Sequence, residues 1–205
     1  MSVKPTIFVS STVYGIEELL ERIYVLLSNF GYEVWMSHKG TMPVSSEKTA
    51  FENCLEAVGK CDTFLGIITP SYGSGIKDGD ISITHHEILK AIELNKPRWM
   101  LAHENVVFAR RLLIDLGLWP LSKDPPILKR GAKSITDLRV IQMYEDAVRH
   151  LIPLEERAGN WVQQFSTDED ALLFATAQFS RFQEAEKFIQ ENLSEPSAII
   201  IRGGE

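Results

Sequence analysis

Cysteine is scarce in this chain, which has only Cys54 and Cys61 among its 205 residues. Two thiols are too few for a disulfide framework, and they lack the four-ligand spacing of a structural zinc site. Long apolar runs are missing too: the longest, such as residues 64–69 and 198–201, fall far short of the roughly 20 residues of a membrane span. Residues 1–5 also lack the pattern of a secretory signal. These absences predict a cytoplasmic protein with two reduced thiols and no membrane segment.

An excess of positive charge is also lacking. The chain has 21 Lys and Arg residues against 28 Asp and Glu residues, for a net charge of −7. A duplex-binding surface would have to be built locally against this acidic background, so nucleic acid is not expected as a partner. What is present is 44% apolar and 24% charged residues. These proportions indicate one large globular domain, or one domain plus an appendage.

Short β-rich runs alternate with segments of helical period over the first half of the chain. The runs that predict strands are residues 6–10, 32–36, 63–69 and 98–102. This alternation is typical of a parallel sheet with helices on both faces, because parallel strands need a helical crossover between them. We therefore expect an α/β domain over residues 1–118.

The second half of the chain has a different pattern. Residues 119–133 have little periodicity and several residues that interrupt helices and strands, so they are expected to be a linker. Over residues 134–205, Ser134 with Asp137 indicates the start of one helix, and Ser166 with Glu169 resembles a capping box at the start of another. The sequence thus predicts a C-terminal α-helical extension.

The second of these helices is too rich in exposed aromatic and aliphatic side chains to stand alone in water. It is expected to pack on the first domain, on its partner helix or on another chain. The closing residues 198–201 fit either an edge strand or a tail.

Hydroxyl side chains stand where the first predicted strand ends. In an open α/β sheet, ligands bind outside the carboxyl ends of the strands, beside helix N-termini with partial positive charge. Ser10 and Ser11 occupy that position and could hydrogen-bond a phosphate or a ribose. Capping of the following helix is an equally good explanation for them, because the turn requires such residues in either case.

A glycine-rich loop and the helix after it bring together a second set of candidate residues. Tyr72 offers an aromatic face, Ser74, Ser82 and Thr84 offer hydroxyls, and Glu87 offers a carboxylate in the first helical turn. Cleavage of a glycosidic bond to a charged base needs an aromatic platform for the base. It also needs a carboxylate that stabilises the oxocarbenium-like centre or attacks it. This loop and helix are therefore the candidate site, with Glu87 as its catalytic residue.

Two simpler explanations compete with that hypothesis. Thr84 and Glu87 have the spacing of a capping box, in which the glutamate only satisfies helix amides. His85 and His86 invite a metal interpretation, but neighbouring helical positions diverge by about 100° and no ligand follows at the i+4 spacing. No metal site is expected.

Several short motifs in the first half resemble a family of uncharacterised domains that is widespread in bacteria and also occurs at the N-terminus of multidomain signalling ATPases. The resemblance covers about residues 5–105 and rests on these segments: Ile7-Phe8-Val9-Ser10-Ser11-Thr12, Glu21-Arg22, Cys61-Asp62, Tyr72-Gly73, Ser82-Ile83-Thr84 with Glu87, Ala91, and Lys96-Pro97. More distantly, the chain is similar to Toll/interleukin-1 receptor (TIR) domains and to nucleoside 2-deoxyribosyltransferases. Both groups place a functional glutamate on the helix after the third strand, where this chain has Glu87.

The resemblance implies a flavodoxin-like or TIR-like fold and, as in the enzymatic relatives, cleavage of an N-glycosidic bond. Many bacterial relatives of this kind act in defence against phage. Deoxyribosyltransferases have an acidic residue in the loop before their glutamate, and Asp78 and Asp80 stand in that loop here. TIR enzymes usually have a further aromatic residue and an acidic loop pattern that this chain does not clearly match.

Two hypotheses follow. In the first, the chain hydrolyses or transfers the N-glycosidic bond of NAD or a nucleoside, with no cofactor beyond that substrate; Tyr72 stacks on the base, and Ser10 and Ser11 hold phosphate or ribose. In the second, it is a non-catalytic TIR-like interaction or nucleotide-sensing module that self-associates through its C-terminal helix. A Glu87 carboxyl exposed in a pocket favours the enzyme, and one folded back on the Thr84 amide favours the module.

Overall fold

The core of the molecule is a five-stranded parallel sheet with the strand order β2-β1-β3-β4-β5. The computed structural model describes residues 4–73, 81–122, 125–157 and 160–181. The strands are β1 (Thr6–Ser11), β2 (Glu33–Trp35), β3 (Thr63–Ile68), β4 (Arg98–His103) and β5 (Asn160–Phe165). This is the flavodoxin-like order of doubly wound folds, so the predicted fold class is confirmed.

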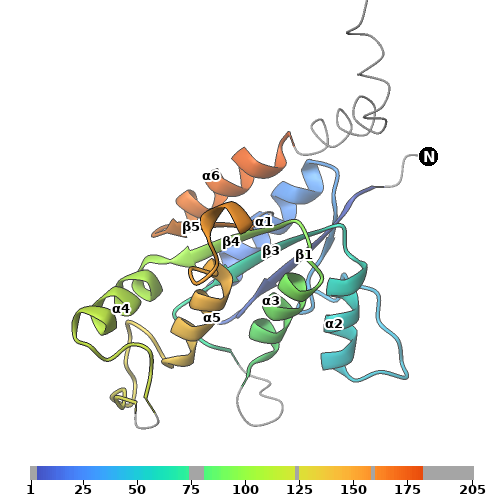
Figure 1. Cartoon of the computed structure of the whole chain (residues 1–205). Helices are drawn as coiled ribbons and strands as arrows, with labels where there is room; N and C mark the ends of the chain where they lie inside the picture. The colour runs from blue at the N-terminus through green and yellow to red at the C-terminus, as the bar shows by residue number, and fades with distance from the viewer. Residues whose placement is uncertain (1–3, 74–80, 123–124, 158–159, 182–205) are drawn as a thin grey trace, which may run out of the picture.

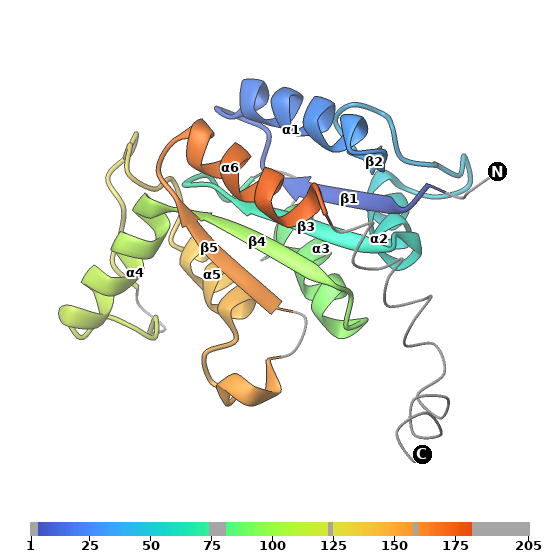
Figure 2. The same ribbon diagram turned by 90° about the horizontal axis from the view of Figure 1, so that it is seen from above.

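Helices cover both faces of the sheet (Figure 2). On one face lie α1 (Glu17–Asn29) and α6 (Asp168–Phe179), and on the other lie α2 (Ala50–Lys60), α3 (Ile83–Glu93) and α5 (Arg139–Val148). All six residues of the central strand β3 are buried as a result. A strand covered on both faces is a continuous apolar run, which explains why residues 63–69 could be predicted as a strand.

Helix α4 (Glu104–Asp115) follows β4 directly and projects from one end of the molecule (Figure 1). Val106 and Leu113 are its two buried residues, and both belong to the apolar cluster that includes α5. An ion pair between Arg110 on α4 and the buried Glu145 on α5 adds a polar contact between these helices. Helix α4 is therefore attached to the rest of the molecule along only one of its own faces.

The region after residue 134 adds a strand to the same sheet and is therefore not a purely helical appendage. Its two predicted helices are present as α5 and α6, but residues 160–163, predicted within the helical extension, lie in strand β5 instead. This strand pairs with β4 from Arg98↔Asn160 to His103↔Phe165. The strand was missed because it lies at the sheet edge, where three polar residues among six hide its pattern. The rest of the predicted long helix and residues 198–201 lie outside the described residues.

Side-chain caps begin four of the described helices, including α4, where the His103 side chain accepts from the Asn105 N–H. Thr49 and Glu52 form a reciprocal capping box at α2, and Thr167 with Asp170 forms another at α6, one residue after the predicted pair. Ser82 caps α3. Among the helices in the described part of the chain, none combines the length and hydropathy that crossing a membrane requires.

Candidate functional site

The candidate site lies at the carboxyl ends of β1 and β3, which are neighbours in the sheet. From β1 the chain continues to β2 on one side, and from β3 it continues to β4 on the other, so the strand order reverses between them. Such a reversal is where doubly wound folds bind their ligands. Ser10 and Ser11 end β1 here, and α3 begins after the loop that follows β3.

Glu87 is buried at this point rather than exposed in a pocket. Its side chain lies on α3, is 3% exposed, and accepts a hydrogen bond of 2.5 Å from the Ser10 hydroxyl at Oε2. The Cys54 thiol on α2 is a second hydrogen-bond partner. Burial raises the pKa of Glu87 to about 7, although both hydrogen bonds lower it. Near neutral pH this carboxyl is therefore divided between its protonated and ionised forms.

The thiol beside it stays protonated. Burial, followed by the charge of Glu87, raises the pKa of Cys54 to about 12. Cys54 is thus a hydrogen-bond donor to Glu87 at neutral pH and not a nucleophile, because only the thiolate attacks.

The capping-box explanation for Glu87 is wrong. Ser82 is the N-cap of α3, and its Oγ accepts from the His85 N–H at 3.3 Å. Glu87 instead turns toward β1, where its partner Ser10 is 77 residues away in sequence. Its carboxyl is neither exposed in a pocket nor folded back on Thr84. The position of this carboxyl therefore does not distinguish the enzyme from the interaction module.

A chain of hydrogen bonds runs from α5 through His85 on α3 to the β3–α3 loop. Asp146 Oδ2 lies 2.8 Å from His85 Nε2, and His85 Nδ1 lies 2.8 Å from the Tyr72 hydroxyl. Because the Asp146 carboxylate accepts, Nε2 holds the imidazole proton and Nδ1 accepts the hydroxyl proton of Tyr72. The Tyr72 oxygen in turn accepts from the Ser82 N–H at 3.3 Å. This chain fixes Tyr72 to the N-terminus of α3.

Tyr72 does not offer an open aromatic face in the structure. Its side chain is 3% exposed, and the Arg139 guanidinium lies 4.7 Å from the centre of its ring. Asp137 holds Arg139 in place, with a distance of 2.6 Å between Oδ2 and Nη2. Burial raises the pKa of Tyr72, so the phenol keeps its proton. The predicted stacking platform is thus already covered by a residue from α5.

The residue after β1 has a buried hydroxyl for which the described part of the chain offers no hydrogen-bond partner. Ser11 Oγ donates to the Ile67 carbonyl at 3.0 Å, so this side chain binds backbone. Thr12 Oγ1 is buried and has no hydrogen-bond partner among the described residues. It faces Gly73, where a Cβ would lie 2.9 Å from this oxygen and where the φ of +92° favours glycine. An unpaired buried hydroxyl at a switch point is a polar group that a ligand could satisfy.

The structure brings together most of the predicted site. Ser10 contacts Glu87 directly, Ser82 joins Tyr72, and Thr84 is buried in the same turn of α3. Ser74 lies outside the described residues. The structure adds four residues to the site: Thr12, whose hydroxyl the sequence offered together with those of Ser10 and Ser11, and Cys54, Arg139 and Asp146, which the sequence prediction missed.

Of these four, only Thr12 and Cys54 left a signal in the sequence. Thr12 follows the two predicted serines, and Cys54 lies on the apolar face of a predicted helix. Asp146 and Arg139 come from a helix more than 50 residues away in sequence, and nothing local indicates where that helix packs. Among the residues that the structure describes, no group of three or more metal-ligating side chains occurs.

A comparison with protein families covers the part of this site that the N-terminal half of the chain forms. A family model described as "Domain of unknown function (DUF4062)" matches residues 6–113, just over half of the 205 residues. The chain belongs to the DUF4062 family. The DUF4062 match includes Ser10, Tyr72 and Glu87, whereas Arg139 and Asp146 lie beyond it.

Other comparisons add little to the DUF4062 assignment. A search of curated proteins finds no match to the chain. Among solved structures, a conserved protein from Enterococcus faecalis V583 is similar, with a TM-score of 0.44 and 13% sequence identity over 86% of this chain and 99% of that chain. A likeness at this level says nothing about the site.

Proposed function

We propose that this DUF4062 chain cleaves the N-glycosidic bond of a nucleoside or of a nucleotide such as NAD, with Glu87 as the acting carboxyl. The observation that supports this most is the buried Glu87 itself, with a pKa of about 7, held by Ser10 at the switch point of the sheet. Strongly perturbed carboxyls concentrate at functional sites, and ligands of such folds bind at this place. The TIR-like resemblance suggests bacterial defence as the setting of this activity.

Cleavage of the N-glycosidic bond requires mainly a carboxylate held close to the ribosyl carbon. When the C1′–N bond breaks, its electron pair leaves with the base and positive charge develops on the ribosyl centre. An ionised Glu87 in a low-dielectric site stabilises that charge or bonds to C1′. Water then supplies the hydroxyl at C1′, and its proton is released. Ser10 orients the carboxylate by donating to Oε2.

The proposal places one requirement on the molecule. Because Glu87 is only 3% exposed, substrate binding must bring this carboxyl into contact with the ribose. The unpaired Thr12 hydroxyl is the group at the switch point that is ready to accept or donate a further hydrogen bond.

A non-catalytic sensing or interaction module is the second candidate. The internal partners of Glu87 and Tyr72 favour it, because both side chains satisfy their hydrogen bonds within the protein. This candidate requires no turnover, and it predicts that replacing Glu87 changes stability alone.

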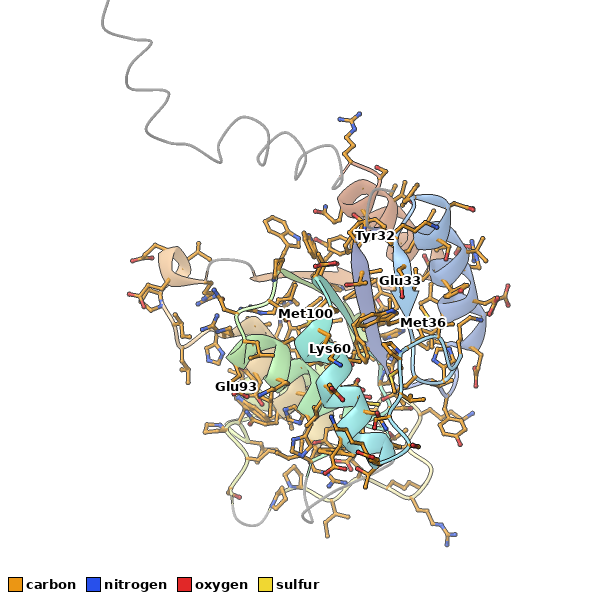
Figure 3. All side chains as sticks on the ribbon, turned by 90° about the vertical axis from the view of Figure 1, so that its right-hand side faces the viewer. Tyr32, Glu33, Met36, Lys60, Glu93 and Met100 are labelled. Carbon is orange, nitrogen blue, oxygen red and sulfur yellow. The ribbon has the colours of Figure 1, made fainter. Side chains whose placement is uncertain are left out.

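Base release separates the two candidates. Concentrated protein is incubated with NAD and with a panel of nucleosides and nucleotides, and nicotinamide or free base is measured by chromatography. The variants are Glu87→Gln and, as a matched control, Glu93→Gln at the exposed end of the same helix (Figure 3). We expect release by the wild type and by Glu93→Gln, and a loss of about 100-fold or more in Glu87→Gln.

Two outcomes would contradict the proposal. Absence of turnover at every protein concentration would reject the glycosidase and favour the non-catalytic interaction module. Equal turnover in Glu87→Gln would remove this carboxyl from the chemistry.

A further inference from the structure

Helix α4 presents apolar side chains to solvent at every fourth position. Phe108 and Leu112 on the helix and the C-cap residue Leu116 directly after it are 65%, 43% and 60% exposed, and we call these three residues the α4 stripe. A helix of a monomeric protein normally turns one apolar face to the core and a polar face to water. Val106 and Leu113 already form the buried face of α4, which packs against the core. The α4 stripe is thus a second apolar face, and a contiguous exposed patch of this kind marks an interaction site.

The position of α4 leaves this face accessible. The helix projects from one end of the molecule and contacts α5 along one side (Figure 1).

We propose that the α4 stripe binds the α4 stripe of a second copy of this chain, with the two helices antiparallel across a twofold axis. A row of residues four apart forms a ridge along the helix, and two such ridges interdigitate at a crossing angle of about −50°. In a twofold interface, the same patch must be complementary to itself. The α4 stripe has that property, because Leu112 lies at its centre with Phe108 and Leu116 one turn away on either side.

The charges beside the stripe favour a second copy over an unrelated partner. Arg111 and Asp115 are exposed on one flank of the stripe, one turn apart, and neither has an ion-pair partner within the described residues. Twofold antiparallel pairing brings the same flank of both copies together with reversed direction. Arg111 of one copy then lies within reach of Asp115 of the other, and symmetry forms this ion pair twice. In a parallel twofold pair, the two copies of this flank would lie on opposite sides of the contact, so these ion pairs would not form.

The first test is the oligomeric state of the whole chain, measured by sedimentation over a range of concentrations. Leu112→Glu places a charge in the centre of the proposed contact. The matched control is Leu173→Glu, because Leu173 is 71% exposed on α6 and lies outside the stripe. We expect a dimer for the wild type and for Leu173→Glu, and a dissociation constant raised by about 30-fold or more in Leu112→Glu. Circular dichroism verifies that both variants fold.

A charge exchange tests the antiparallel geometry. Arg111→Glu alone and Asp115→Arg alone are each expected to weaken the dimer, and the double variant is expected to restore it, because the ion pairs re-form with reversed sign. Leu112→Cys gives an independent measure. Both native cysteines are buried, so a covalent dimer that forms on oxidation would report the contact at position 112.

The proposal has clear points of failure. A wild type that stays monomeric at every concentration would overturn it, and the stripe would then have another occupant. A dimer that persists unchanged in Leu112→Glu would place the interface elsewhere. Failure of the charge exchange to restore the dimer would refute the antiparallel pairing.

Discussion

The replacement Glu87→Gln should change how the stability of the protein depends on pH. A glutamate in the unfolded chain has its ordinary pKa of 4.5, and burial raises that of Glu87 to about 7 in the folded protein. Between these values the folded state binds one proton more than the unfolded state, so stability falls as the pH rises. A difference of roughly 2.5 pKa units corresponds to about 3 kcal/mol. This contribution is fully present below pH 4.5 and is lost by about pH 7.

The free energy of unfolding can be measured by urea denaturation at a series of pH values from 4 to 8. Other groups titrate over the same range, so the informative quantity is the difference between the wild type and Glu87→Gln at each pH. A glutamine has no proton to lose here. The wild type should therefore lose about 3 kcal/mol relative to the variant across this range.

The control is Glu93→Gln, which removes an exposed carboxyl from the same helix. Its difference from the wild type should show no comparable slope. A difference for Glu87→Gln that is constant with pH would refute the reasoning, because the pKa of Glu87 would then be the same in the folded and unfolded states. A slope of opposite sign would mean that the folded protein stabilises the ionised carboxylate.

Three further experiments test other parts of the site. Tyr72→Phe removes a hydroxyl that bonds His85, and the buried groups left unpaired should lower the free energy of unfolding by about 1–3 kcal/mol in urea denaturation; an unchanged midpoint would mean that water replaces the hydroxyl. Gly73→Ala places a Cβ 2.9 Å from Thr12 Oγ1 at a positive φ and should destabilise the fold by more than about 1 kcal/mol. In a double-mutant cycle, Thr12→Ala should recover part of the stability lost in Gly73→Ala. If the free-energy changes of the two substitutions simply add, residues 12 and 73 are not in contact. Cys54, with a pKa of about 12, should react with a thiol reagent only after unfolding, and rapid labelling of the native protein would contradict its burial.

The sheet was predictable where its strands are buried on both faces. β3 and β4 appear in the sequence as apolar runs between helical segments, and the parallel topology follows from the helices between them. β5 was not predictable in this way. It lies at the sheet edge, and its three polar residues resemble those of an exposed helix or loop.

The candidate site was predictable in outline, because strand order alone brings the end of β1 beside the start of α3. That rule places Ser10 near Glu87, and the two side chains do form a hydrogen bond. The burial of Tyr72 was not predictable, since it depends on Arg139, which arrives from α5. Helix packing between distant segments depends on side-chain shape, which no short motif records.

The pairing of β5 with β4 makes the unit that folds larger than the unit that the family match covers. A chain that ended at residue 113 would leave the full length of β4 as an open edge, with buried residues such as Met100 and Leu101 uncovered. Open apolar edges recruit strands from other molecules and lead to aggregation. During synthesis, the ribosome must therefore deliver residues through Phe165 before the sheet has its last strand. Until then β4 has an unpaired edge, and a truncation inside this interval should yield insoluble protein rather than a smaller native domain.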